Sequence, residues 1–423
     1  MKQRKRIEWT RLDNASKIFP ATYNHQDTKV FRLVCELKEA VEPDKLQTAL
    51  DMTMREFPLF RSVLRKGVFW YYFESSELEP SIDEESLPVC APLYIKDRKN
   101  LLFQVSYYHN RINLEVFHAL SDGTGALWFL KSLVCHYLCL AHTTKFALQE
   151  PLLGYSTSLS KRMDDSFGRH FIGTKALKSN LPATTASRAY LIRGSRLDEN
   201  RLKVIEGCMS AKAVLEQAHA HHTTLTVFLS SLFIYAIYKE MPLRSIHRPI
   251  ILSIPINLRQ FFESETARNF FSTMSIGYHF NNEQADLGNI IKSVDESFKK
   301  ELTSDKLKNH LNRLIALEKN PLARIVPLPA KDLSLRAVDK IRDRGITASL
   351  SNLGRITMPG ELGSHIERFS VFTSARRPQI CLCSFEDRLV VTFSSPFRET
   401  EIQRNFFTYL SEKGIECDIT SNQ

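Results

Sequence analysis

The sequence has no apolar run long enough to cross a lipid bilayer. Its longest one, residues 225–238, is shorter than the roughly 20 residues that a spanning helix needs and contains hydroxyl side chains. We therefore expect a core helix there. The first nine residues carry four basic side chains, but the apolar stretch of a secretory signal does not follow them. Neither a membrane-spanning nor an exported protein is expected, and peripheral contact with a membrane is left open.

Cysteine patterns typical of zinc sites are also missing. Eight cysteines occur, but Cys135 with Cys139 and Cys381 with Cys383 lack the ligand spacing of a zinc site. The histidine cluster at 219–222 has no acidic or cysteine partner at such spacing, so we expect no metal. Without an export signal the thiols are expected to be free, in a reducing, cytoplasmic compartment.

Long basic tracts and nucleic-acid-binding modules are absent, so nucleic acid is not an expected partner. The chain is nevertheless mildly basic, with 57 Lys and Arg against 47 Asp and Glu and a formal charge of +10. Basic side chains spread over a water-exposed surface would account for this charge. The alternative is that they attract an anionic cofactor, carrier protein or membrane. With 423 residues, 43% hydrophobic and 25% charged, the chain is long enough for two folded domains.

A β-hairpin is expected at residues 101–118. Two runs rich in β-branched and aromatic residues, 101–108 and 111–118, flank the turn at 109–110. Because side chains alternate along a strand, His118 ends the apolar face of the second run. The chain breaks at 121–125, and a helical pattern follows. This position suits a catalytic base. The alternative is a core histidine whose ring nitrogens are hydrogen-bonded within the protein.

Other elements follow from periodicity and turn residues. A helix is expected from residue 43 to Pro58, and a strand at 68–74. The polar stretch 154–188 is interpreted as the crossover between two halves, 1–180 and 181–423. In the second half we expect strands at 189–192, 249–255, 346–354, 379–385 and 388–395, and helices at 210–219, 225–238, 287–319 and 399–413.

The spacing His118-x-x-x-Asp122-Gly123 resembles the HxxxDG signature of the chloramphenicol acetyltransferase-like superfamily of acyltransferases. Other features resemble the family in the same order along the chain. They are the proline and arginine that follow the first helix, an apolar helix capped by Thr224 or Thr226, Arg259 after a strand, a short crossing strand at 269–273, and the SNxG strand end at 351–354. The likeness is closest to bacterial alcohol acetyltransferase-like proteins and condensation domains. The DFGWG box of plant members is missing, as it is from condensation domains.

This resemblance implies an α/β fold of two chloramphenicol acetyltransferase-like halves, each a mixed β-sheet flanked by helices, with the active site in a tunnel between them. It implies that His118 is the catalytic base and that Arg259 holds Asp122, with Gly123 completing the motif. A developing oxyanion needs a hydrogen-bond donor. The candidate donors are Ser272, Thr273, Ser351 and Asn352.

The function implied is transfer of an acyl group from a thioester, with acyl-CoA as co-substrate, to a small hydroxyl or amine acceptor, expected to be an apolar alcohol. Alternatives are a condensation-type enzyme whose donor is bound to an acyl or peptidyl carrier protein, and a non-catalytic binding protein of the same fold. A dinucleotide-binding turn at Gly123-Thr124-Gly125 is disfavoured, because Trp128 stands where the third glycine would be.

Overall fold

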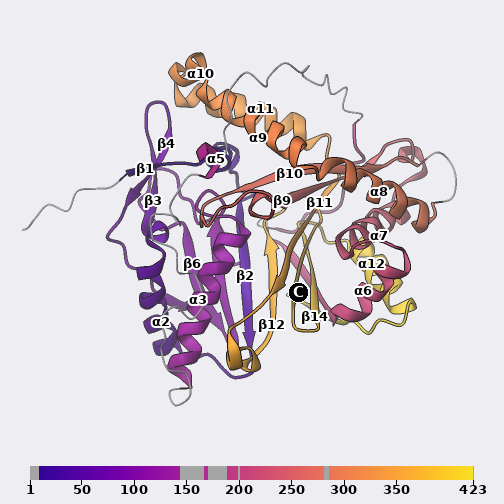
Figure 1. Ribbon diagram of the computed structural model, residues 1–423, viewed down its shortest axis with the longest axis horizontal. Coiled ribbons are helices and arrows are strands. Elements are labelled where there is room, and N and C mark those ends of the chain that lie inside the picture. Colours follow the sequence, from indigo (N-terminus) through magenta and orange to yellow (C-terminus); the bar gives the residue numbers. More distant parts are fainter. Residues whose placement is uncertain (1–8, 143–165, 170–187, 199–200, 281–284, 423) are drawn as a thin grey trace, which may run out of the picture.

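The computed structural model describes residues 9–142, 166–169, 188–198, 201–280 and 285–422. Two large mixed β-sheets, of five and seven strands, lie beside each other and carry helices on their outer faces (Figure 1). Most of the expected crossover, 154–188, lies outside the described residues. The division into halves 1–180 and 181–423 stays a prediction.

The five-stranded sheet contains the hairpin expected at residues 101–118. Its antiparallel strands β6 and β7 run from Phe103 to Tyr108 and from Arg111 to Phe117, which confirms that prediction. One edge strand comes from far along the chain, because β12 pairs antiparallel with β2. The sheet order is β12 (Ile366–Thr373), β2 (Val30–Leu37), β7, β6 and β5 (Ile82–Glu84).

Two helices cover this sheet. The first, α2 (Pro43–Glu56), begins and ends as the sequence predicts, since Pro43 opens it and Pro58 follows it. The second, α3 (Gly123–Ala141), packs against α2, β2 and β7. The expectation that no apolar run is long enough to cross a membrane is corrected here, because α3 is long and apolar enough, as is the bent helix pair 211–220 and 225–239 if it is counted as one span. Among the described residues α3 is mostly buried inside the protein, as the core helix of a soluble protein would be.

A small three-stranded sheet, β1 (Trp9–Arg11), β4 (Tyr71–Ser75) and β3 (Ser62–Lys66), completes this part of the molecule. The strand expected at 68–74 starts three residues later, because Gly67 donates its backbone N–H to the carbonyl of Trp70 and closes a turn.

The seven-stranded sheet faces the five-stranded one across the centre of the molecule (Figure 1). The strand expected at 189–192 is wrong. Residues 188–195 lie in no strand, and Tyr190 makes one backbone hydrogen bond, to the carbonyl of Pro249. The sheet order is β10 (Phe271–Tyr278), β9 (Ile250–Asn257), β11 (Ala348–Ile356), β13 (Gln379–Phe385), β14 (Arg388–Ser395), β8 (Lys203–Ser210) and β15 (Asp418–Ser421).

Strand β11 differs from its expected form. The segment Ser351-Asn352-Leu353-Gly354 was expected to end the strand, but β11 continues to Ile356 with a register shift between Asn352 and Arg355. Gly354 has a φ of +85°, a left-handed conformation that favours glycine. The motif therefore lies at an irregularity within the strand.

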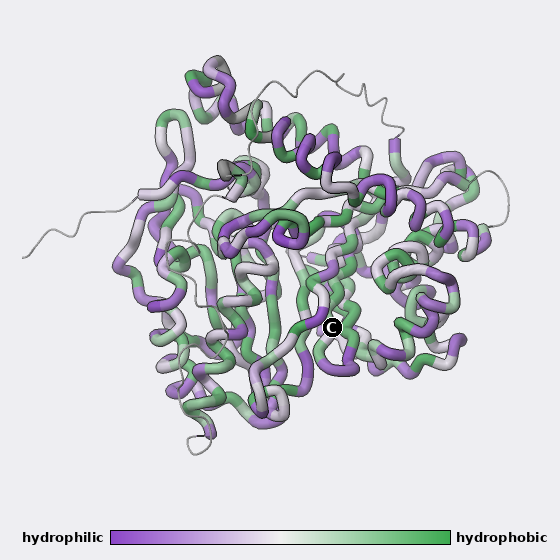
Figure 2. The backbone as a smooth tube through the Cα atoms, in the orientation of Figure 1, coloured by the Kyte–Doolittle hydropathy of each residue, from purple (hydrophilic) through white to green (hydrophobic). Residues whose placement is uncertain are grey.

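The helices of the second half contain both hydrophilic and hydrophobic residues (Figure 2). The helix at 328–343 leaves Leu333, Val338 and Ile341 more than half exposed. Thr224 caps α7 by accepting a hydrogen bond from the backbone N–H of Val227, which settles the choice between Thr224 and Thr226. The region expected as one helix at 287–319 is two helices. The helices are α6 (Ala211–Ala220), α7 (Leu225–Lys239), α8 (Leu287–Glu301), α9 (Ser304–Lys319), α10 (Pro321–Ile325), α11 (Leu328–Asp343) and α12 (Glu401–Glu412), with the short α1 (Ile18–Thr22) and α5 (Ser166–Arg169) earlier in the chain.

Candidate active site

A cavity of about 360 Å³ lies between the two sheets. Its wall is built by β2, β12 and the end of β7 on one side, and by β9, β10, β11 and β13 on the other, with the last turns of α11 beside them. Of the residues that the sequence singled out, His118, Asp122, Gly123, Thr273, Ser351 and Asn352 line it.

His118 lies directly after β7, where its backbone N–H donates to the carbonyl of Lys29 at 2.8 Å. Three phenylalanines surround its ring. Phe19 stacks on it at a centroid distance of 4.4 Å, and Phe31 and Phe271 lie at 5.0 and 5.5 Å. The ring is thus shielded from solvent by apolar groups while part of its surface faces the cavity.

Asn269 fixes which nitrogen of the His118 ring carries the proton. Its Oδ1 lies 3.2 Å from Nδ1 of His118, while its Nδ2 donates to the His118 carbonyl at 2.9 Å and to Ser16 Oγ at 2.9 Å. An amide oxygen can only accept, so Nδ1 carries the hydrogen and Nε2 keeps the lone pair. No hydrogen-bond partner of Nε2 occurs among the described residues, which leaves this nitrogen available to a substrate.

A further contact supports Asn269 from the N-terminal segment. The Ser16 hydroxyl that accepts from Asn269 donates to Asp13 Oδ2 at 2.5 Å, and the Ser16 backbone N–H donates to Asp13 Oδ1 at 2.7 Å. Asp13, Ser16 and Asn269 are almost fully buried. The orientation of His118 therefore depends on residues from two distant parts of the chain, residues 13–16 and Asn269.

Burial lowers the pKa of the His118 imidazole below its ordinary value, and this effect outweighs the opposing influence of Asp122 and of the hydrogen bonds to Nδ1. The ring is therefore neutral at pH 7, the form that can accept a proton.

Asn269→Asp should move the acid limb of the pH–rate profile of acyl transfer to higher pH. In the unaltered protein we expect the rate to stay constant from pH 7 to below about 6.5, the ordinary histidine pKa, and to fall only when His118 becomes protonated. A carboxylate against Nδ1 stabilises the imidazolium and raises its pKa, so the fall begins at higher pH. The measurement is the rate at limiting substrate from pH 5 to 9, and an unshifted limb would show that Asn269 does not contact the base.

Asp122 is oriented by three contacts and does not point at the reacting centre. Its Oδ1 accepts from the backbone N–H of Gly125 at 3.0 Å, which caps α3, and its Oδ2 accepts from the backbone N–H of Phe270 at 2.8 Å. Arg259 Nη1 lies 2.8 Å from the same Oδ2. The contact that the resemblance implies is present, through one guanidinium nitrogen.

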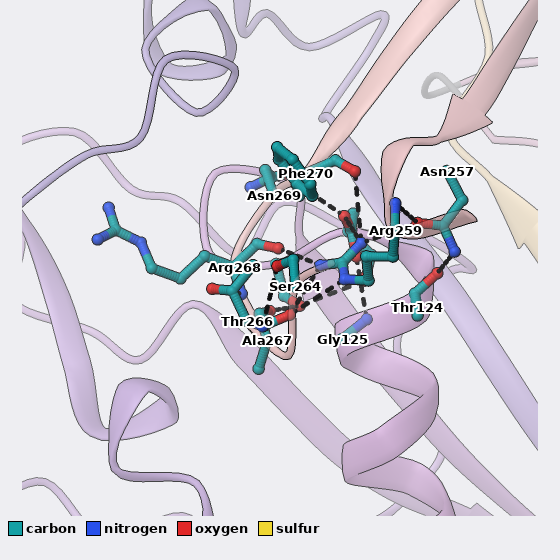
Figure 3. Close-up of polar contacts among 12 residues, drawn as sticks. Thr124, Gly125, Asn257, Arg259, Ser264, Thr266, Ala267, Arg268, Asn269 and Phe270 are labelled. Carbon is teal, nitrogen blue, oxygen red and sulfur yellow. Dashed lines mark hydrogen bonds and ion pairs between the residues drawn. The ribbon is translucent and has the colours of Figure 1, made fainter. Parts of the chain in front are cut away.

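The rest of the Arg259 guanidinium is held by backbone oxygens (Figure 3). It donates to the carbonyls of Thr266, Arg268 and Phe270, and its Nη1 also reaches Asn257 Oδ1. Both Arg259 and Asp122 side chains are 7% exposed. This ion pair ties the start of α3 to the segment between β9 and β10.

The two glycines of the turn differ in how closely they approach other groups. A Cβ on Gly125 would lie 2.1 Å from the carbonyl oxygen of Ala267, whereas one on Gly123 would meet only the side chain of Leu353, at 3.2 Å. Gly125 is thus the position at which α3 and the loop before β10 touch backbone to backbone.

Gly125→Ala should lower the melting temperature strongly, because α3 or the Ala267 segment must move to admit the methyl group. Gly123→Ala is the matched control and should have a much smaller effect, since the Leu353 side chain can rotate. Thermal melts of both variants test this, and equal melting temperatures would contradict it.

The four candidate oxyanion donors differ in position. Ser272 is buried, lies on the other face of β10 and is not among the residues that line the cavity. Thr273 Oγ1 accepts from Arg342 at 2.6 Å, and Asn352 Nδ2 donates to Thr226 Oγ1 at 2.9 Å. Ser351 lines the cavity, and its hydroxyl has no partner among the described residues. Because Thr273 only accepts, the hydroxyl hydrogens of both Thr273 and Ser351 have no acceptor among the described residues, and both residues line the cavity.

The eight cysteines are free thiols, as expected, and none forms a disulfide within the described part of the chain. Burial raises the pKa of Cys381, which lines the cavity, to about 12, so its thiol stays protonated and unreactive at pH 7. One group among the described residues has metal-ligating atoms close together: Glu39, His142 and His365. It lies outside the cavity lining, and Glu39 is exposed.

Sequence reasoning missed Asn269 as a partner of His118, and the roles of Ser16, Phe19 and Phe31. Asn269 was noticed only as the start of a strand. No local pattern could have indicated the contact, because 151 residues separate Asn269 from His118.

No family model and no curated protein matches the chain. Solved structures do match over nearly its full length. TRI3 trichothecene 15-O-acetyltransferase from Fusarium sporotrichioides is 10% identical with a TM-score of 0.62, covering 96% of this chain and 94% of its own. TRI101 of F. graminearum, complexed with coenzyme A and T-2 mycotoxin, is 12% identical at a TM-score of 0.60, covering 97% and 99%. The first condensation domain of the CDA synthetase is 13% identical at 0.57, covering 96% of both chains.

The chain has the chloramphenicol acetyltransferase-like fold. The expected architecture of mixed sheets flanked by helices is confirmed. At these identities the likeness establishes the chloramphenicol acetyltransferase-like fold alone. The cavity lies between the two sheets of this fold.

Proposed function

We propose that the protein is an acyltransferase that moves an acyl group from a thioester to a hydroxyl or amine acceptor, with His118 as the general base. The observation that carries the proposal is a neutral imidazole whose Nδ1 is held by Asn269 and whose Nε2 has no partner among the described residues, at the wall of a cavity between two sheets. The fold is shared with acetyltransferases and condensation domains.

His118 would act at both proton transfers. Nε2 takes the proton of the acceptor as its oxygen or nitrogen forms a bond to the thioester carbonyl carbon. When the carbon–sulfur bond breaks, the imidazolium returns the proton to the leaving thiolate. Because both substrates meet at one base, no covalent enzyme intermediate is needed.

Charge that develops on the carbonyl oxygen needs a donor, and the hydroxyls of Ser351 and Thr273, which line the cavity with their hydrogens unused, are the proposed donors. Such a donor commonly lowers the barrier by about 3–4 kcal/mol. Asp122 and Arg259 do not take part in proton transfer in this scheme. They fix the turn that follows His118, because their ion pair joins the start of α3 to the loop before β10.

Acyl-CoA is the proposed donor, in a cytoplasmic setting, and two observations support it. TRI101 is complexed with coenzyme A, and a starter condensation domain of the same fold is complexed with C8-CoA. A carrier-protein-bound donor is the second candidate, because condensation domains share the fold. Both donors present a thioester to the cavity, so the action of His118 is the same for either.

The experiment that tests the proposal is thiol release from acetyl-CoA and longer acyl-CoA thioesters with a panel of alcohols and amines. Acceptor-dependent release is the expected result. If none occurs with any pair, acyl N-acetylcysteamine thioesters should be tried as mimics of a carrier-bound donor. Absence of release there too would favour a non-catalytic binding protein.

A further inference from the structure

Three polar side chains form a row across the cavity wall of the seven-stranded sheet. Ser253 of β9 and Gln379 of β13 are both paired in register with Ser349 of β11, which lies between them. Residues in register on neighbouring strands point to the same face of a sheet, and all three line the cavity. The row therefore presents two hydroxyls and an amide to whatever fills this end of the cavity.

None of these three side chains hydrogen-bonds to another side chain or backbone group of the described chain. Ser253 is 8% exposed, and the other two are only partly exposed. A ligand-binding cavity commonly carries a few polar side chains that orient the ligand. A wall of three such groups without protein partners is suited to a ligand that supplies hydroxyl groups of its own.

The row lies four residues along β9 and β11 from the residues that contact the turn at 121–125, which follows His118. Leu353 of β11 touches the turn, since a Cβ on Gly123 would meet its side chain, and Asn257 of β9 donates to Thr124 Oγ1. Ser349 and Ser253 each lie four residues earlier on the same strands. At about 3.3 Å per residue this is roughly 13 Å, about the length of two sugar rings.

The carboxylates at this end of the cavity are paired with arginines. Asp339 and Asp343 line the cavity at the end of α11, close to the start of β11. They are paired with Arg376 and Arg377, which immediately precede β13. Arg342 lines the cavity at the same end. The two carboxylates are thus balanced by arginines, and the uncharged hydroxyl and amide groups of the row are complementary to a neutral ligand that forms hydrogen bonds.

We propose that the row of Ser253, Ser349 and Gln379 binds the remote hydroxyl groups of a neutral polyhydroxylated acceptor, such as a glycoside, whose reacting hydroxyl lies at His118. This inference rests on the proposed acyltransferase function and replaces the apolar alcohol that the sequence favoured. In the transfer the reacting oxygen gives its proton to Nε2 and gains the acyl group, and the donor leaves as a protonated thiol.

The test compares two acceptors with acetyl-CoA as donor: methyl β-maltoside, which has two sugar rings, and 1-octanol, which has one hydroxyl. We expect the maltoside to be the better acceptor. The double variant Ser349→Ala/Gln379→Leu should raise the KM for the maltoside about tenfold, since two hydrogen bonds are lost. The KM for acetyl-CoA should not change. Ser384→Ala, on the other face of β13, is the matched control and should leave both values unchanged.

The proposal would be overturned if 1-octanol were the better acceptor, or if the double variant had the same KM for the maltoside as the unaltered protein. A rise in the KM for acetyl-CoA in the double variant would also overturn it, because the row would then contact the donor. Saturation-transfer NMR with the maltoside measures binding without turnover. If no thiol is released from any pair, a saturation-transfer signal from the maltoside that is weaker in the double variant still supports the acceptor site. Absence of this signal would overturn it. Failure of the proposed catalysis is thereby kept distinct from failure of the proposed site.

Discussion

His118→Ala is expected to lower the rate of acyl transfer by about 10³-fold or more, because a positioned general base contributes on the order of 10² to 10⁴. The described residues hold no second base in the place of His118, whose ring is enclosed by Phe19, Phe31 and Phe271. His118→Gln, which keeps a polar side chain without a basic nitrogen, should lose a similar factor. The measurement is kcat for acceptor-dependent thiol release.

The control for this experiment is His109→Ala, at the exposed turn at the other end of β7. It should leave kcat unchanged. Both variants should keep the far-ultraviolet circular dichroism of the parent, because neither residue lies in a helix. Turnover retained by His118→Ala would mean that the proton is accepted elsewhere, and the assignment of the base would have to be abandoned.

Asp122→Ala should destabilise the protein by about 3–5 kcal/mol, the usual cost of leaving one member of a buried ion pair alone. The change removes the partner of Arg259 and also the acceptor for the backbone N–H groups of Gly125 and Phe270. Asp122→Asn should cost less, because the amide oxygen can still accept one of these bonds. The free energy of unfolding from denaturant titration measures both effects.

Asp387→Ala is the matched control for Asp122→Ala. Asp387 also accepts hydrogen bonds near the start of a helix, from Lys212 and Ser210, but it is exposed to solvent. Its loss should change stability much less. If Asp122→Ala and Asp387→Ala unfolded at the same denaturant concentration, the pair with Arg259 would contribute nothing to the fold.

The sequence predicted the elements whose signals are local. The hairpin that ends in His118 follows from alternation and a turn, and α2 follows from apolar spacing between two prolines. The strand at 189–192 was wrong because a short apolar run cannot show whether a pairing partner exists. Such a partner is a property of the folded sheet.

The candidate site was predictable only where a motif holds several residues together. His118, Asp122 and Gly123 lie within six positions, whereas Asn269 reaches His118 only after the two sheets come together. The row of Ser253, Ser349 and Gln379 is likewise created by strand order. Nothing in the sequence near any of the three indicates that they are neighbours.

The pairing of β12 with β2 also has a consequence for biosynthesis. Residues 366–373 complete the edge of a sheet whose other strands are all formed before residue 118. During synthesis β2 therefore stays an open edge until most of the chain has left the ribosome, and open edges attract other strands. Nascent or truncated chains that end before Ile366 should depend on chaperones, and they should aggregate through β2 when chaperones are scarce.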